Sequence, residues 1–305
     1  MIVAKDLTKS FPKNPAVSSL DFKIQKGEIF GIVGPDGAGK STLLRLMSTI
    51  LVPDKGELLI NDVDIFKDSY LIKEKMAYMP QRFGLYEDLT VEENIYFFGR
   101  LFSVPGKEIK KRSKRLYDFS KLGPFKDRLA GKLSGGMKQK LGLACSLIHT
   151  PEIILLDEPT NGVDPVSRRE FWKILYDLLG EGVTIVVSTA YLDEAERCNR
   201  IALMYKGKFI RLGEPKSIRK GINKKLLEIN VTEPMECELI LQGSGDFKTI
   251  IRSGSFIRIF TGDMNKTKTK VRRLLQKNKK EIISIKQVMP SLEDTFVEII
   301  SEEEL

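Results

Sequence analysis

Residues 29–44, IFGIVGPDGAGKSTLL, decide the fold of this 305-residue chain. The apolar run that opens the stretch predicts a buried strand, residues 42–47 predict a helix, and the turn between them fits the pattern G-x-x-x-x-G-K-[S/T]. Glycines let such a turn curl until its N–H groups converge on a phosphate, and the helix N-terminus adds positive potential. The expected phosphate-binding residues are Gly34, Pro35, Asp36, Gly37, Ala38, Gly39, Lys40, Ser41 and Thr42.

Three side chains of this phosphate loop have separate expected roles. Lys40 would reach the β- and γ-phosphates of a nucleoside triphosphate, and Ser41 would offer its hydroxyl to Mg²⁺. Thr42 is placed to support the phosphates with a second hydroxyl. The alternative is a glycine turn that binds no ligand, which the flanking strand and helix patterns disfavour.

A second apolar run, residues 153–156, ends in two acidic residues. A carboxylate at the C-terminal end of a buried strand faces the nucleotide crevice in doubly wound sheets. We therefore expect Asp157 to hold Mg²⁺ through water, and Glu158 to polarise the attacking water and accept its proton. The alternative for this pair is a solvated strand end.

Between these two motifs lies a signature run, residues 133–139, LSGGMKQ. Together with GPDGAGKS and LLDEP it resembles the nucleotide-binding subunits of ABC transporters, over roughly residues 1–215. The resemblance implies a head-to-tail dimer in which Ser134, Gly135 and Gly136 reach the γ-phosphate held by the opposite subunit. Two glycines and a serine at a helix N-terminus suit that role, because they present unobstructed N–H donors to an anion.

The resemblance extends to single positions. Phe11 resembles the aromatic residue that stacks on adenine, and a core phenylalanine is the alternative. Gln81 resembles the glutamine that contacts Mg²⁺ and the attacking water and relays the nucleotide state to the membrane partner. Asp164 resembles the carboxylate of a loop that crosses to the other subunit, and its alternative is an ordinary helix cap before Pro165.

One position departs from the family pattern. The strand at residues 184–189 should be followed by a histidine, and this chain has Ala190. In relatives the imidazole contacts the γ-phosphate, and the loss of one preorganised donor typically costs about 10²- to 10³-fold in rate. The single histidine, His149, fits a helix end better than a replacement for that imidazole.

Two accounts of Ala190 stay open. Hydrolysis proceeds slowly or by altered positioning, or this subunit is a poor catalyst whose intact signature run completes the competent site of a partner. The retention of Lys40, Gln81 and Glu158 favours a working ATPase.

Composition limits the remaining choices. A chain of 305 residues with 42% apolar content can form one large core and a small accessory domain, but not two nucleotide-binding units. No apolar run approaches the roughly 18 residues of a membrane-spanning helix, and the N-terminus does not read as a signal peptide. We expect a peripheral protein at the cytoplasmic face, with a separate permease in the membrane. The scattered Cys145, Cys198 and Cys237 indicate buried, reduced thiols.

The net charge of +9 reflects in part the basic residues crowded into residues 266–280. Val271, Leu274 and Leu275 would form an apolar stripe on the same helix, so we expect a solvated cationic face. Contact with anionic lipid or a permease is the alternative, and a nucleic-acid partner is not expected.

The predicted fold class is α/β: a P-loop NTPase core with an antiparallel β edge and a helical insert, plus a small C-terminal α+β domain. Residues 1–220 would form the nucleotide-binding domain, with the insert at about 82–131 opened by a Thr90–Glu93 capping box. Residues 221–305 would form the accessory domain. Its elements would be strand 225–231, helix 235–241, hairpin 247–251 with 255–260, helix 264–276, strand 282–285 and a tail helix capped by Ser291.

The tail, residues 290–300, PSLEDTFVEII, resembles that of ATP-binding subunits of ABC-2-type drug exporters. The resulting hypothesis is a subunit that hydrolyses Mg²⁺-ATP in a homo- or heterodimer and drives a permease, for which Phe83, Leu85 and Tyr86 are candidate contacts. Those three residues pack inside the insert in the alternative. A regulatory subunit with a degenerate site is one competing hypothesis. A soluble ABC protein acting on translation or DNA is the other, although no tandem unit or long heptad arm supports it.

Overall fold

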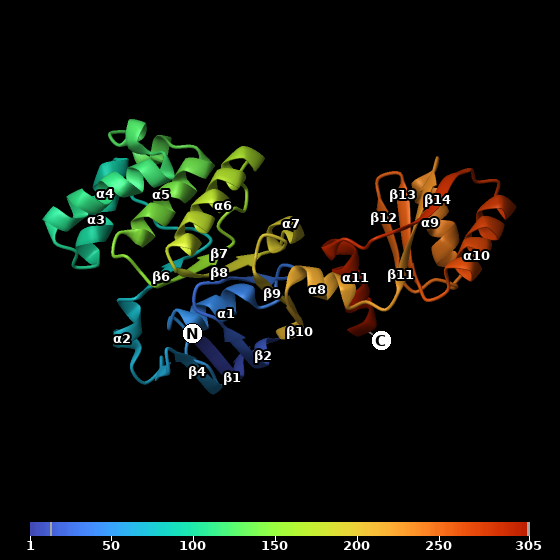
Figure 1. The fold of residues 1–305 in the computed structure, drawn as a ribbon, viewed down its shortest axis with the longest axis horizontal. Coiled ribbons are helices and arrows are strands. Elements are labelled where there is room, and N and C mark those ends of the chain that lie inside the picture. Colours follow the sequence, from blue (N-terminus) through green and yellow to red (C-terminus); the bar gives the residue numbers. More distant parts are fainter. Residues whose placement is uncertain (13, 304–305) are drawn as a thin grey trace. The chain divides into compact units, whose positions relative to one another are not determined.

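A computed structural model describes residues 1–12 and 14–303, which form two compact units, Met1–Leu212 and Gly213–Leu305 (Figure 1). The second unit begins earlier than the expected boundary at residue 221. The reason is that α8 (Pro215–Lys220) packs against the tail helix α11 (Leu292–Glu303). The segment expected to end the first domain therefore belongs to the second unit.

The centre of the first unit is a largely parallel sheet in the order β10-β9-β3-β8-β7-β6. The inner strands β3, β7 and β8 are buried at every residue, as expected of strands covered on both faces. The strands span β3 Ile29–Val33, β6 Met76–Met79, β7 Ile153–Asp157, β8 Thr184–Thr189, β9 Arg200–Tyr205 and β10 Lys208–Gly213.

The predicted antiparallel edge is a second sheet of this unit, in the order β2-β1-β4-β5. Its strands are β1 Ile2–Phe11, β2 Asn14–Ile24, β4 Lys55–Ile60 and β5 Val63–Asp64. Side chains of this sheet share one apolar core with helix α1 (Lys40–Met47) and with the inner face of the parallel sheet. The helix that follows the phosphate loop is thereby fixed between two sheets.

The helical insert leaves the parallel sheet after β6. It contains α3 (Val91–Leu101) and α4 (Gly106–Ser120) and leads through the 3-10 turns Gly123–Phe125 and Ala130–Lys132 into α5 (Gly135–Leu147). The predicted capping box opens α3, because Thr90 Oγ1 accepts from Glu93 N at 3.2 Å and Glu93 Oε2 accepts from Thr90 N at 2.8 Å. The remaining helices of the unit are α2 Ser69–Lys73, α6 Pro165–Gly180 and α7 Leu192–Ala195.

Between α8 and α11, the second unit has the element order β-α-β-β-α-β, with antiparallel strands in the order β12-β13-β11-β14. Helices α9 and α10 pack on one face of this sheet and share its core. Val271 and Leu275 of α10 are fully buried there, as the apolar stripe predicts. The elements span β11 Lys225–Val231, α9 Pro234–Gly243, β12 Ile250–Ser253, β13 Phe256–Thr261, α10 Met264–Lys277 and β14 Ile282–Val288.

Two further expectations concern the whole sequence. Cys145, Cys198 and Cys237 are buried and free, and burial raises the pKa of each thiol. Across residues 1–12 and 14–303, every helix is too short or too polar to span a membrane.

Candidate functional site

The phosphate loop runs from the end of β3 into α1, and its shape depends on glycine. Gly37 and Gly39 have φ values of +78° and +108°, in the region that side chains disfavour. A Cβ atom on Gly39 would lie 2.0 Å from the carbonyl oxygen of Ala16, and one on Gly34 would lie 2.2 Å from that of Met204. The close approach of neighbouring backbone therefore excludes side chains at both positions.

The loop forms one wall of a cavity of about 390 Å³, here called the phosphate cavity. Gln81 and Glu158 form the opposite side, so the structure brings together the loop, the end of β6 and the end of β7. The lining residues are Ala16, Asp36, Gly37, Ala38, Gly39, Lys40, Ser41, Thr42, Gln81, Glu158 and Asn161.

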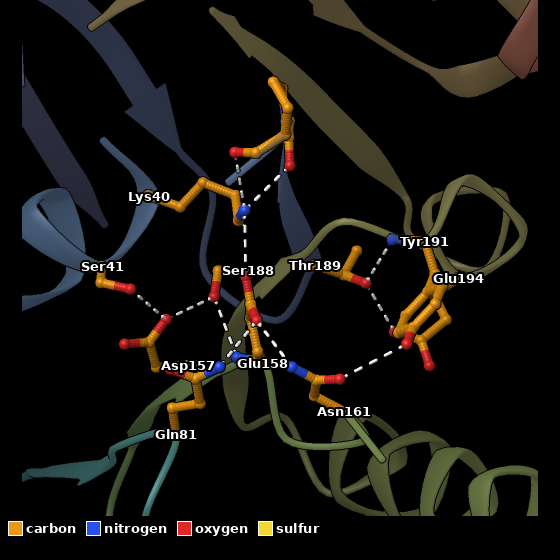
Figure 2. Close-up of polar contacts among 12 residues, drawn as sticks. Lys40, Ser41, Gln81, Asp157, Glu158, Asn161, Ser188, Thr189, Tyr191 and Glu194 are labelled. Carbon is orange, nitrogen blue, oxygen red and sulfur yellow. Dashed lines mark hydrogen bonds and ion pairs between the residues drawn. The ribbon is translucent and has the colours of Figure 1, made fainter. Parts of the chain in front are cut away.

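Lys40 is the cation of this cavity, and only 4% of its surface is exposed. Its ammonium donates to the carbonyl oxygens of Gly34 at 2.8 Å and Pro35 at 3.1 Å, and it lies 2.9 Å from Glu158 Oε1 (Figure 2). The carbonyl oxygens of Gly34 and Pro35 thus fix the position of the ammonium at the wall of the cavity. The three donors of the ammonium are thus all engaged, so a phosphate that binds Lys40 must replace one of these contacts.

Asp157 ends β7 with 2% of its surface exposed. Its Oδ1 accepts from Ser41 Oγ at 3.0 Å and from Ser188 Oγ at 2.7 Å, while the Tyr78 hydroxyl lies 3.4 Å from Oδ2. Burial and the charge of Asp157 raise the pKa of Tyr78. The hydroxyl of Ser41 thus meets a buried carboxylate at the edge of the phosphate cavity.

Hard oxygen donors of this kind fit Mg²⁺, which is usually bound by one or two carboxylates together with substrate phosphates and water. The described residues hold no cluster of three or more His, Cys, Asp or Glu side chains suited to a metal ion. Ser41 and Asp157 could therefore hold an ion, Asp157 through water, and Gln81, which lines the same cavity, could contact it as well. The ion would take its other oxygens from phosphate and water.

Glu158 has a strained backbone, with a φ of +47°. Left-handed conformations of residues other than glycine cost about 1–3 kcal/mol and persist where the surroundings enforce them. Here the backbone N–H of Glu158 donates to the carbonyl oxygen of Ser188 at 3.2 Å and to its hydroxyl at 3.0 Å. On the side chain, Oε2 accepts from Gln81 Nε2 at 3.1 Å and from Asn161 Nδ2 at 3.2 Å. Ser188 thus holds the backbone, and two polar side chains, Gln81 and Asn161, fix the direction of the carboxylate.

The segment after β8 places Tyr191 next to Asn161, which lines the phosphate cavity (Figure 2). Ala190 is exposed and offers a methyl group where the family pattern places an imidazole. The Tyr191 hydroxyl lies 3.4 Å from Asn161 Oδ1, and its backbone N–H donates to Thr189 Oγ1 at 2.9 Å. Thr189 in turn donates to Glu194 Oε2 at 2.8 Å.

The sequence motifs give no role to Ser188 or Tyr191, and they place Asn161 only in the loop that resembles the family's crossing loop. Ser188 follows three apolar residues near the end of a strand that is buried at every residue, a signal that could point to it. Asn161 and Tyr191 carry no such signal, because only the folded chain brings them to Glu158.

The signature run lies at the start of α5. Ser134 is the N-cap, and its hydroxyl accepts from the backbone N–H of Met137 at 3.3 Å, as expected. Gly135 is exposed, and a Cβ on it would meet nothing within 4 Å. Gly136 is buried, and a Cβ on it would lie 2.5 Å from Ser167 of α6. One face of this helix start is open while the other packs on the next helix.

Asp164 caps α6 next to this contact. Its Oδ1 accepts from the N–H groups of Val166 at 3.0 Å and Ser167 at 2.9 Å, and the bonds from Ser167 hold the pKa of this carboxyl below its usual value. The helix cap that was the alternative for Asp164 is therefore present, and the loop it ends is exposed at Gly162.

Other predicted residues lie elsewhere in the first unit. Phe11 is 46% exposed on β1, with the Lys9 ammonium 5.9 Å from its ring centroid. Within the described part of the chain, the wall of the phosphate cavity includes neither Phe11 nor the signature run. His149 stacks on Phe102 with ring centroids 4.0 Å apart and contacts the carbonyl oxygen of Met76, which fits its expected place at a helix end.

Comparison with known proteins places these motifs among relatives. A family model described as "ABC transporter" matches residues 17–161. The chain is 46% identical over 258 residues to the probable multidrug ABC transporter ATP-binding protein YbhF of Escherichia coli (strain K12), covering 80% of this chain and 45% of that protein. It is 34% identical over 311 residues to the Nod factor export ATP-binding protein I of Rhizobium sp. (strain N33), covering 99% of this chain and 98% of that one. The chain thus spans less than half of the first relative's length and nearly all of the second.

Two solved structures show a similar fold. One is cbiO1 from Clostridium perfringens, described as part of the ABC transporter complex cbiONQ, with 28% identity, a TM-score of 0.67 and coverage of 72% of this chain and 90% of that chain. The other is a dimeric post-hydrolysis state of the ATP-binding cassette MJ0796 bound to ADP and Pi, with 28% identity, a TM-score of 0.64 and coverage of 70% and 98%. The predicted α/β fold with a phosphate loop is confirmed.

Proposed function

The chain belongs to the family of ABC transporter ATP-binding proteins, and we propose that it is the ATPase subunit of an exporter. In this proposal two such subunits, identical or different, close on two ATP molecules and move a separate membrane permease, and hydrolysis reopens the pair. The observation that carries it is the convergence of Lys40, Ser41, Gln81 and Glu158 on one cavity beside the phosphate loop, with the buried Asp157 bound to the Ser41 hydroxyl.

Each of these five residues has a role in this proposal. Lys40 binds the β- and γ-phosphates in exchange for its contact with Glu158. Ser41, Gln81 and, through water, Asp157 would hold Mg²⁺, which would neutralise charge on the phosphate oxygens. Glu158 accepts a proton from the attacking water, and Gln81 orients both the carboxylate and the water.

The second half of each site comes from the other subunit. The open N–H groups at the start of α5, from Ser134 to Gly136, would donate to the γ-phosphate bound by the partner's loop. Ser134 and Gly135 are exposed, and none of the three residues lines the phosphate cavity of its own chain, which supports this role. The dimeric state of the similar MJ0796 cassette supports it as well. Asp164 would order the crossing loop, and Phe11, exposed on β1, would stack on adenine.

An aromatic cluster on the insert is the proposed permease contact. Tyr86 and Phe97 have ring centroids 4.5 Å apart and are 49% and 36% exposed, and Phe83 packs beneath them against Phe98 with centroids 5.1 Å apart. Exposed aromatic side chains grouped in this way favour a protein partner. The names of the multidrug and Nod factor relatives favour export, and docking to a permease would hold this chain at the cytoplasmic face of the membrane.

A regulatory, weakly hydrolysing subunit is the second candidate, because Ala190 presents only a methyl group at the strand end. ATP turnover by the purified chain separates the two. The proposed ATPase should hydrolyse ATP, and Glu158→Gln should remove nearly all of that turnover while ATP still binds. A parent chain with no more turnover than Glu158→Gln contradicts the proposal, and turnover that returns only with a second ATPase subunit supports the regulatory candidate.

A further inference from the structure

We propose that Tyr191 and Asn161 act together as positioning residues for Glu158, in place of the imidazole that Ala190 lacks. This inference rests on the proposed ATPase function and names a part of its machinery that the sequence motifs do not include. The contacts that carry it run in one line, from the Tyr191 hydroxyl to Asn161 Oδ1 and from Asn161 Nδ2 to Glu158 Oε2 (Figure 2).

The direction of these two hydrogen bonds explains how Tyr191 can orient Asn161 toward Glu158. An amide has one acceptor end and one donor end, so a hydroxyl that donates to Oδ1 turns Nδ2 toward the next acceptor. Asn161 is exposed, and its bond to Glu158 alone would hold only one end of its amide. The hydroxyl of Tyr191, 3.4 Å from Oδ1, favours the orientation in which Asn161 donates to the carboxylate.

Tyr191 is itself held from several sides. Its backbone N–H is bound to Thr189, and the guanidinium of Arg168 lies 4.3 Å from its ring centroid. Arg168 and Thr189 both contact Glu194, whose side chain is fully buried between them. A buried carboxylate therefore anchors the two groups that fix the tyrosine.

The contacts from Tyr191 through Asn161 to Glu158 matter most once Lys40 has bound phosphate instead of Glu158. Lys40 contacts Oε1 of Glu158, whereas Gln81 and Asn161 contact Oε2. Exchange of Lys40 onto phosphate frees Oε1 and leaves both Oε2 contacts in place. Oε1 is then the oxygen available to the attacking water, and Gln81 and Asn161 decide its direction.

Steady-state ATP hydrolysis by the full chain tests this inference. Tyr191→Phe removes only the hydroxyl, so kcat should fall about 3- to 10-fold with the KM for ATP within about twofold, the effect of one neutral hydrogen bond on a positioned group. Asn161→Ala should lower kcat at least as much. Tyr191→Phe should add little to Asn161→Ala, because the two residues act in series.

Tyr176→Phe is the matched control, since its hydroxyl binds the backbone carbonyl of Arg197 at 3.2 Å and touches no residue of the phosphate cavity. Its kcat should equal that of the parent. If Tyr191→Phe matches Tyr176→Phe, or if its loss is additive with that of Asn161→Ala, the positioning line is wrong although the ATPase function stands. If the parent shows no more turnover than Glu158→Gln, the proposed function fails, and the inference fails with it.

Discussion

At the scale of single residues, the contact between Lys40 and Glu158 links binding to chemistry. Both groups are largely buried, with side-chain exposures of 4% and 11%. Separating such a pair is costly unless each member gains a new partner. Phosphate supplies the new partner for Lys40, and the attacking water supplies one for Glu158. In the proposed function, arrival of the triphosphate is therefore what releases the base.

Ala190→His should restore the missing donor. We expect turnover to rise roughly 3- to 10-fold, less than the full effect of a preorganised donor, because Asn161 and Tyr191 already orient Glu158. Ala190→Leu, which adds a side chain of comparable size but no hydrogen-bond donor, is the control for size. Initial rates at saturating Mg²⁺-ATP measure both variants. Equal turnover of the parent and Ala190→His would show that the missing imidazole does not limit hydrolysis.

The sequence predicted the residues of this site unevenly. Lys40, Ser41, Asp157 and Glu158 follow from local patterns, since a glycine turn and a strand end fix their surroundings. The contact between the backbone of Ala16 and Gly39 could not be predicted from a local pattern, because Ala16 belongs to another strand, β2. Residues that act through tertiary contact alone lack a signal in their own neighbourhood.

At the scale of elements, caps at helix starts position the functional segments. Thr90 opens α3 with both bonds of a capping box. Thr90→Ala should lower the free energy of unfolding by about 0.5–2 kcal/mol, since the loss of a cap leaves backbone donors unsatisfied. Urea unfolding followed by circular dichroism measures the change, and Thr90→Ser, which keeps the hydroxyl, is the control. A Thr90→Ser variant as unstable as Thr90→Ala would mean that the cap is not the cause.

In the second unit, a buried ion cluster gives a pH dependence. Burial tends to raise the pKa of Glu228, but hydrogen bonds from Arg258 and Lys286 outweigh burial and lower it. The folded-state pKa therefore lies below the usual value of 4.5. The contribution of Glu228 to stability is then fully present above pH 4.5 and is lost as the pH falls through the lower folded-state value.

Glu228→Gln tests this pH dependence. The variant should be less stable than the parent at pH 7, and the difference should shrink as the pH is lowered from 4.5 toward 2, a range that lies below the usual pKa. Thermal unfolding at several pH values measures it, with Glu57→Gln as the control, because Glu57 pairs with Lys5 on the surface. A difference that stays constant over this range would rule out the titration of Glu228.

Element order in the second unit followed from hydrophobic periodicity, while element ends did not. The first hairpin strand was expected at 247–251 and lies at Ile250–Ser253, because Gly254, with a φ of +58°, makes a tight turn directly after it. The turn fixes the register of a hairpin more strictly than an apolar run does. The domain boundary was misplaced for a related reason, since packing of α8 on α11 is a tertiary contact.

At the scale of the whole molecule, the first unit carries two separate motif-bearing surfaces, which the proposed function makes the two halves of a site. One is the phosphate cavity, whose cation is Lys40. The other is the start of α5, whose N–H donors lie on a surface that shares no described residue with that cavity. From sequence alone, only the family resemblance implied this division, because a motif does not reveal which surface it faces. The division is what makes a second chain necessary in the proposed function.

The most direct test of that claim is the mass and turnover of the full chain with Mg²⁺-ATP, measured together on the parent and on Ser134→Arg. Light scattering of Glu158→Gln, which slows reopening, should show twice the 34.6 kDa of one chain. Adding Ser134→Arg should leave ATP binding within about threefold, because the loop is untouched, yet hold the mass at one chain. In the parent background, Ser134→Arg should abolish turnover. Full turnover by Ser134→Arg, or by a parent chain that stays at 34.6 kDa with ATP bound, would contradict the account.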